Sequence, residues 1–156
     1  MHGLTMTRDE YTHTLDVLDR WADTLVAKSD QQITGAAFGL MDDGQGGRRG
    51  GMCALGALHY TLHGEPRPHD FYVINLDGAP DAFVLDLVAR TAARQNRVDD
   101  YQERRDASHL TPIPFLNDVA GLSFVQFAGA VRSTRLWLME HVAVEEEVPT
   151  PDQVPA

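Results

Sequence analysis

The sequence predicts a mainly α-helical single domain, with α+β as the alternative, in which about three to five helices pack around a buried central helix. Two long stretches carry apolar residues at alternating spacings of four and three, which is the period of a helix with one buried face. A shorter stretch between them contains small and apolar residues, so we expect it to lie between the first and last helices. A small extended or hairpin element completes the expected fold.

The first helix is expected from about Arg8 to Lys28. Thr7 and Glu10 have the spacing of a capping box, in which each side chain accepts a hydrogen bond from the backbone N–H of the other residue. The aspartates between the apolar positions should face water. The apolar stripe that follows the capping box consists of Tyr11, Leu15, Leu18, Ala22 and Leu25.

The next segment is rich in glycine. Residues Ile33 to Leu40 are expected to include a short extended element, and the glycines of residues 42–51 predict a flexible loop or hairpin. A glycine loop before a helix can bind phosphate. Here no Gly-Lys-Ser/Thr follows, and Arg49 occupies the third glycine position of a G-x-G-x-x-G motif. The sequence therefore does not predict a nucleotide site.

The central helix is expected from about Met52 to His63, with Gly64 closing it. Its small residues should let the backbone of another element approach closely. Cys53, the only cysteine, would lie near the start of the helix, where the helix dipole favours a reactive thiolate. The alternative, which we expect, is a small apolar residue in a packed core.

Two histidines of this helix, His59 and His63, are four residues apart and therefore share one face, as in metal-binding helices. His69 follows closely enough to complete a coordination shell. A zinc protease would need glutamate where Tyr60 stands. The alternative is a pair of solvated histidines that interact favourably with the C-terminal end of the helix dipole. We expect no bound metal and no cofactor.

In the second half, Phe71 to Leu76 is rich in aromatic and branched residues and is the best candidate for a strand. Pro80 should open a third helix that continues to about Gln95. The charged residues 97–105 predict either a short exposed helix or a connection. We expect residues 111–114, Thr-Pro-Ile-Pro, to be extended, because proline disfavours helical backbone in the preceding residue.

The last helix is expected from about Phe124 to Val144, because Ser123 and Gln126 form a second capping box before another apolar stripe. The globular domain would then span residues 1–144. Residues 145–156 combine several acids with prolines and lack an apolar stripe, so we expect an acidic, disordered tail.

Composition excludes several classes of protein. The net charge of −10 disfavours direct nucleic-acid binding, which needs a basic surface. No apolar run approaches the ~20 residues of a membrane-spanning helix. The N-terminus lacks the basic and apolar blocks of a signal peptide, and a single cysteine cannot form an internal disulfide. We therefore expect a cytoplasmic protein that binds another protein, and an acidic surface would attract a basic partner.

Cys-Ala-Leu-Gly-Ala-Leu at residues 53–58 and Leu-Asn-Asp at residues 116–118 make the chain resemble a family of small bacterial and phage proteins. Those proteins carry a leading helix, a Gly-Ala-Phe segment, a Cys-x-x-Gly-Ala-Leu helix and a Trp-Asn-Asp turn before a last helix. Residues 35–38 approximate the second feature, Leu116 replaces the tryptophan, and residues 67–108 match no family feature. The resemblance implies no activity, because none is established for that family.

Three functions follow as hypotheses. A non-catalytic binding or regulatory module is expected first, because no constellation forms a catalytic signature. The alternative is a cysteine hydrolase with Cys53 as nucleophile, His109 as base and Asn117 or Asp118 as the orienting group. In the simpler interpretation, Asn117 and Asp118 form a turn before the last helix. A metal-binding protein built on His59 and His63 is the second alternative.

Overall fold

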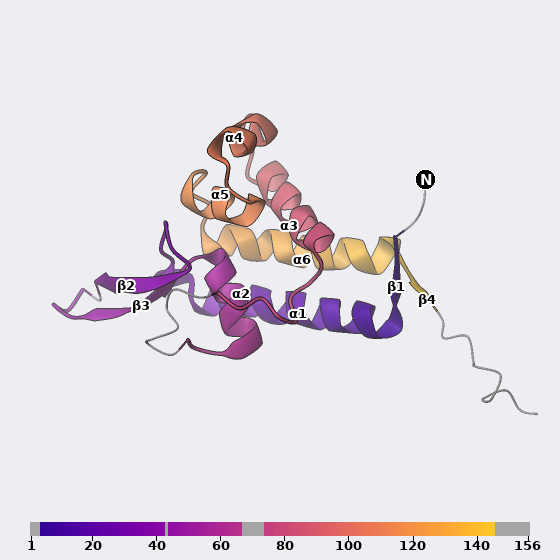
Figure 1. The fold of residues 1–156 in the computed structure, drawn as a ribbon, viewed down its shortest axis with the longest axis horizontal. Coiled ribbons are helices and arrows are strands. Elements are labelled where there is room, and N and C mark those ends of the chain that lie inside the picture. The colour runs from indigo at the N-terminus through magenta and orange to yellow at the C-terminus, as the bar shows by residue number, and fades with distance from the viewer. Residues whose placement is uncertain (1–3, 43, 67–73, 146–156) are drawn as a thin grey trace, which may run out of the picture.

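The computed structural model describes residues 4–42, 44–66 and 74–145. These residues form a mainly helical fold with two small sheets, which confirms the predicted fold class (Figure 1). The helices are α1 (Arg8–Ala27), α2 (Ala54–His63), α3 (Ala82–Gln95), α4 (Tyr101–Ser108), α5 (Pro112–Asp118) and α6 (Phe124–His141), with a 3-10 turn η1 (Ser29–Gln31). The strands are β1 (Leu4–Thr7), β2 (Phe38–Asp42), β3 (Arg48–Met52) and β4 (Val142–Glu145).

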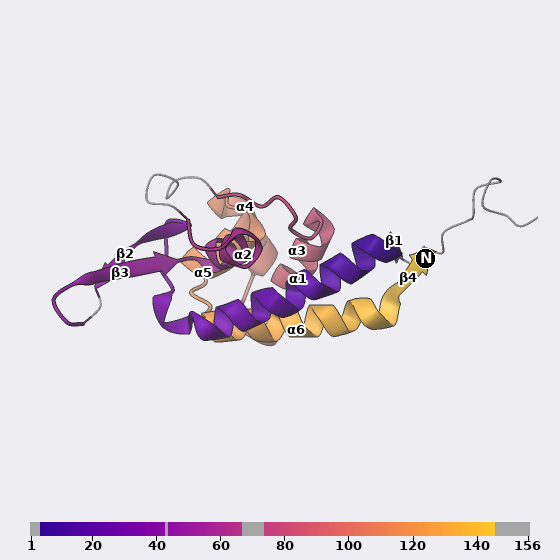
Figure 2. The same cartoon turned by 90° about the horizontal axis from the view of Figure 1, so that it is seen from below.

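The long helices α1 and α6 pack directly against each other and form one layer of the molecule. Figure 2 shows them side by side along one face, with α2, α3, α4 and α5 all on the other side of the layer. They run antiparallel, since α1 begins at β1, α6 ends at β4 and these two strands pair. The prediction that α2 lies between the first and last helices is therefore wrong. The apolar stripes of α1 and α6 bury one another, and α2 packs against α1 and α5.

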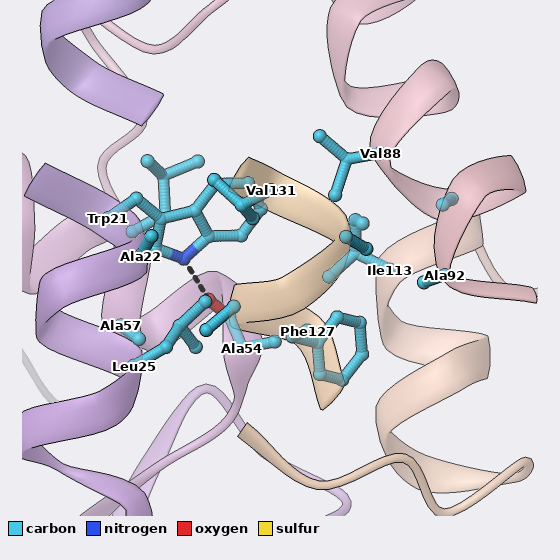
Figure 3. Packing of buried hydrophobic residues seen from close by; sticks show 14 of the residues in the cluster. Trp21, Ala22, Leu25, Ala54, Ala57, Val88, Ala92, Ile113, Phe127 and Val131 are labelled. Atoms are coloured by element: carbon cyan, nitrogen blue, oxygen red, sulfur yellow. Dashed lines mark hydrogen bonds between the residues drawn. The ribbon is translucent and has the colours of Figure 1, made fainter. Parts of the chain in front are cut away.

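The hydrophobic core lies where this layer meets the other helices, and Trp21 is at its centre (Figure 3). The Trp21 indole Nε1–H donates a 3.1 Å hydrogen bond to the carbonyl of Ala54, so the one polar atom of this buried ring is satisfied. Leu58 is fully buried and Leu55 packs partly buried against the core, which confirms that α2 is a buried helix. The other largest fully buried side chains include Phe115, Phe124, Phe127, Leu18, Leu25, Leu116 and Leu138.

The start of α2 is approached closely by another element, as its small residues predict. A Cβ added at Gly56 would collide with the carbonyl oxygen of Ala37, which precedes β2. The same carbonyl accepts a 3.0 Å hydrogen bond from the backbone N–H of Cys53. Glycine at position 56 therefore lets the chain before the hairpin pass directly over the helix.

Both capping boxes are present, and α1 and α6 begin where the sequence predicts. The end of α6 differs from the prediction of about Val144. The helix stops at His141, and Val142 to Glu145 form β4, which pairs in parallel with β1 through Leu4 and Val142 up to Thr7 and Glu145. Alternate residues of β4 are partly buried, so its valines favour a strand over a further helical turn. Glu145 therefore belongs to the folded part, and the predicted tail beyond it lies outside the described residues.

The glycine-rich stretch forms the predicted hairpin, which projects from one end of the helical body (Figure 1). β2 and β3 are antiparallel, with Phe38 opposite Met52 and Gly39 opposite Gly51. The strand β3 extends into residues expected to be loop, because ladder hydrogen bonds need only the backbone. At Gly51 an added Cβ would meet Ile33, so a larger residue would disrupt the packing beneath the hairpin.

The second half contains the predicted third helix, α3, and the charged stretch forms the short helix α4. Of the extended backbone expected at residues 111–114, only Thr111, the N-cap of α5, is extended; the prediction is wrong for residues 112–114, because α5 begins at Pro112. Proline fits a first helical turn, where the missing N–H has no partner in any case. Of the predicted strand, residues 71–73 lie outside the described residues, and Ile74 to Leu76 form no strand. No helix of the described chain is long and apolar enough to cross a bilayer.

Candidate functional site

Cys53 is the N-cap of α2. The predicted helix, which began at about Met52, placed it inside the first turn, and the structure places it just before the helix. Its Sγ accepts a 3.4 Å hydrogen bond from the backbone N–H of Gly56, and the residue is 7 % exposed. Burial raises the pKa of the Cys53 thiol; the hydrogen bond from Gly56 opposes this shift less strongly, and the Asp118 carboxylate adds to it. The thiol is therefore protonated at neutral pH, which is the opposite of an activated nucleophile.

Asn117 is fully buried, and all of its hydrogen-bonding capacity is used. Its Oδ1 accepts hydrogen bonds from the backbone N–H of Ala54 at 3.1 Å and from Nε2 of Gln32 at 3.0 Å. Its Nδ2 donates to the carbonyl of Ile33 at 2.9 Å and to the Asp118 carboxylate at 2.8 Å. The side chain thus holds the start of α2 in place and has no free atom to orient a catalytic histidine.

Gln32 extends this arrangement, and we call the two residues the Gln32–Asn117 amide pair. Nε2 of Gln32 also donates to the carbonyl of Leu122 at 2.7 Å, and its Oε1 accepts from the backbone N–H of Phe124 at 2.9 Å. The pair therefore joins the starts of α2 and α6, the end of α5 and the segment before β2. Sequence reasoning missed Gln32, because neither its spacing nor its neighbours signal a buried amide.

The proposed catalytic residues are only partly brought together. Asp118 lies at the end of α5, close enough for its charge to raise the pKa of the Cys53 thiol, and its carboxylate accepts a bond from Asn117. His109 is exposed and caps the end of α4. Within the described chain it makes no hydrogen bond to Cys53, Asn117 or Asp118. Within the described residues, the structure thus places a carboxylate and an amide near the thiol, and the proposed base His109 does not join them.

His59 and His63 have different environments. His59 is buried at 6 % exposure, and its Nδ1 accepts a 2.9 Å hydrogen bond from the backbone N–H of Asn75. The prediction that both histidines are solvated is therefore wrong for His59, whereas His63 is exposed as predicted. Their rings are in edge contact at 5.4 Å between centroids. Among residues 4–42, 44–66 and 74–145 no group of three or more metal-ligating side chains could hold an ion. His69 lies outside these ranges, so metal binding stays a prediction to be tested.

An apolar cleft of about 270 Å³ opens between α2, α3 and α5. Leu55 of α2, Leu85 of α3 and Ile113 of α5 form its walls, and Asp86 and Thr111 supply its polar groups. The remaining lining residues are Leu76, Ala82, Pro112 and Pro114. Sequence analysis did not identify this cleft, because its walls come from helices that are far apart in the chain.

No protein-family model, curated protein or solved structure matches this chain. The resemblance to the bacterial and phage family therefore stays a prediction based on its short motifs.

Proposed function

We propose that this protein is a non-catalytic binding module that holds a side chain of a protein partner in the cleft between α2, α3 and α5. The apolar lining of the cleft carries the proposal. Leucine and isoleucine side chains from three helices converge there and leave an open apolar hollow at the surface. The wall contributed by Leu55 is rigid, because α2 is buried on its other side.

The size of the cleft favours a peptide side chain over a metabolite. Its volume of about 270 Å³ is comparable to the smallest of the roughly 300–1,000 Å³ pockets that enclose small molecules, so the cleft leaves little room beyond a side chain. One or two apolar side chains of a partner fit such a hollow as anchors, and burial of each contributes about 1.5–3 kcal/mol.

The charge around the cleft favours a basic partner. Asp86 lines the cleft and forms a 2.8 Å ion pair with Arg90, and Asp81 is exposed at the start of the same helix. The whole chain carries a net charge of −10. Lysine or arginine residues on either side of an apolar anchor would be attracted to this surface and would accelerate association.

The cysteine-hydrolase alternative is less well supported. Burial favours the protonated form of Cys53, and the buried amide of Asn117 is committed to backbone groups. Neither arrangement is expected of a nucleophile and its orienting group, because a nucleophile needs a nearby base.

The probe for the proposed function is a short lysine-flanked peptide with a single central leucine. Added to ¹⁵N-labelled protein, it should shift the backbone amide signals of Leu55, Leu85 and Ile113. The same peptide with serine in place of leucine should leave these signals unchanged. Absence of shifts up to about 1 mM peptide, or equal shifts with both peptides, would contradict the proposal.

A matched pair of variants tests the location. Ala82→Trp fills the cleft from an exposed position on its rim and should abolish the shifts. Ala27→Trp makes the same change at an exposed residue at the end of α1, which does not line the cleft, and should leave binding intact. Equal loss of binding in both variants would place the peptide elsewhere.

A further inference from the structure

The outer surface of the α1–α6 layer carries exposed apolar side chains. Val125 and Leu136 of α6 are 59 % and 58 % exposed, Met139 is 48 % exposed and Val26 of α1 is 43 % exposed. Figure 2 shows that the remaining helices lie on the opposite side of the layer. We call this surface the outer face; it comprises Thr12, Asp16, Asp19, Asp23 and Val26 of α1 with Val125, Gly129, Arg132, Leu136 and Met139 of α6.

Both helices present a second stripe on this face, distinct from the stripe that forms the core. The five α6 residues follow one another at spacings of four, three, four and three, and the five α1 residues do the same. This spacing places each set along one seam on one side of its helix. The α6 seam contains three large apolar residues, whereas Val26 is the only one on the α1 seam. Within the described residues neither seam is covered.

The two seams have opposite charge. The α1 seam carries three aspartates, of which Asp16 forms a 3.0 Å ion pair with Arg20, and the only charged residue of the α6 seam is Arg132. Within one chain Arg132 lies 3.5 Å from Asp23, and both side chains are at least half exposed. Each of them therefore remains accessible to a partner that presents the opposite charge.

We propose that the outer face binds a second copy of this chain, with α6 of one copy on α1 of the other. A two-fold axis parallel to the helices brings Arg132 opposite the acidic seam twice. It also brings Val125, at the start of α6, to Val26, near the end of α1. The arrangement that stacks identical helices would place three aspartates on three aspartates, so charge selects between the two.

Gly129 supports the contact independently. A Cβ at this position would meet no atom within 4 Å, and its backbone has no positive φ. The folded monomer therefore has no need for glycine there, although glycine weakens a helix interior. On the outer face, glycine allows a helix of a second copy to approach closely.

The face is large enough for a specific interface. α1 has 20 residues, which corresponds to about 30 Å, and two helices with side chains span about 20 Å. The resulting area of roughly 600 Å² in projection approaches the ~800 Å² of accessible surface that each partner buries in a standard interface.

The test uses the full chain, with mass measured by light scattering and sedimentation at about 100 μM and low salt. The wild type should be a dimer. Asp23→Arg and Arg132→Asp should each raise the dimer dissociation constant by about tenfold or more, because like charges then face each other. Asp99→Arg, at an exposed position outside the face, is the control and should stay dimeric.

Mixing the two charge-reversed variants decides the geometry. Arg132 of the Asp23→Arg chain then faces Asp23 of the other chain, and the reversed pair matches as well, so a heterodimer should form. The double variant should dimerise with itself. Circular dichroism checks that each variant keeps its helices.

A monomeric wild type would overturn the proposal, and so would dimers that persist in both single variants. Single variants that stay monomeric after mixing would overturn it too. Gly129→Leu should weaken the dimer without loss of helix content; an unchanged dimer would exclude close packing at this residue. These results are independent of peptide binding in the cleft, because the outer face and the cleft share no residue.

Discussion

The Gln32–Asn117 amide pair allows a quantitative prediction. Asn117→Ala removes an amide that serves the backbone N–H of Ala54, the carbonyl of Ile33 and Nε2 of Gln32. If Asn117 is structural, the variant should be strongly destabilised. If it orients a catalytic base, its removal should spare stability and affect only activity.

The magnitude follows from the groups left behind. The Ala54 N–H is buried, so losing its acceptor costs about 1–3 kcal/mol. The Ile33 carbonyl belongs to a partly buried residue and contributes less, as does Gln32, which keeps its bond to Leu122. Together with the volume lost from a fully buried site, Asn117→Ala should lower the free energy of unfolding by about 3–5 kcal/mol.

Urea unfolding measures this difference, provided that the slope of the transition is unchanged. Asp118→Ala is the matched control, because the neighbouring side chain is only partly buried and accepts a hydrogen bond from Asn117. It should lose about 1 kcal/mol, because Nδ2 of Asn117 keeps its bond to the Ile33 carbonyl. If Asn117→Ala fails to fold, Gln32→Ala should still fold and lose about 1–3 kcal/mol.

A loss below about 1 kcal/mol in Asn117→Ala would refute the reasoning, because that value does not cover even one orphaned buried group. A larger loss in Asp118→Ala than in Asn117→Ala would do so as well. Either result would reopen the hypothesis that this segment serves catalysis.

Four further predictions concern α2. Native Cys53 should react slowly with thiol reagents at neutral pH and quickly after unfolding, and fast native labelling would revive the hydrolase hypothesis. Because its pKa is raised in the fold, the unfolded chain releases the thiol proton first; stability should fall as pH rises above the ordinary value of about 8.5, and Cys53→Ser should remove this component. Leu58→Ala should lower the free energy of unfolding by about 2–5 kcal/mol in urea, and a loss below 1 kcal/mol would contradict its full burial. Elemental analysis should find no stoichiometric zinc, whereas one ion per chain that is lost in His59→Ala would establish a metal site.

Sequence patterns predicted the parts of the fold that depend on neighbouring residues. The capping boxes at Thr7 and Ser123 place the starts of α1 and α6, because a cap is formed within one helical turn. Gly64 ends α2 for the same kind of local reason, with a positive φ at the C-cap. The burial of Leu58 follows from the composition of its helix.

Other elements depended on distant partners. Val142 to Glu145 continue a helical stripe in sequence and become a strand because β1, at the opposite end of the chain, offers a hydrogen-bonding edge. Pro112 suits either an extended segment or a first helical turn. In the helical conformation that this segment adopts, Ile113 and Phe115 are buried in the core.

The candidate sites show the same division. From sequence alone, Cys53 could be a nucleophile and Asn117 an orienting group, and their order in the chain is compatible with these catalytic roles. The tertiary structure determines their state: burial keeps the Cys53 thiol protonated, and atoms from Gln32, Ile33 and Ala54 occupy the amide of Asn117. The sequence by itself determined that α1, α2, α3 and α6 form and where α1 and α6 begin. Only the tertiary structure determined which surfaces remain uncovered and which polar groups are occupied, because both depend on contacts between residues far apart in the chain.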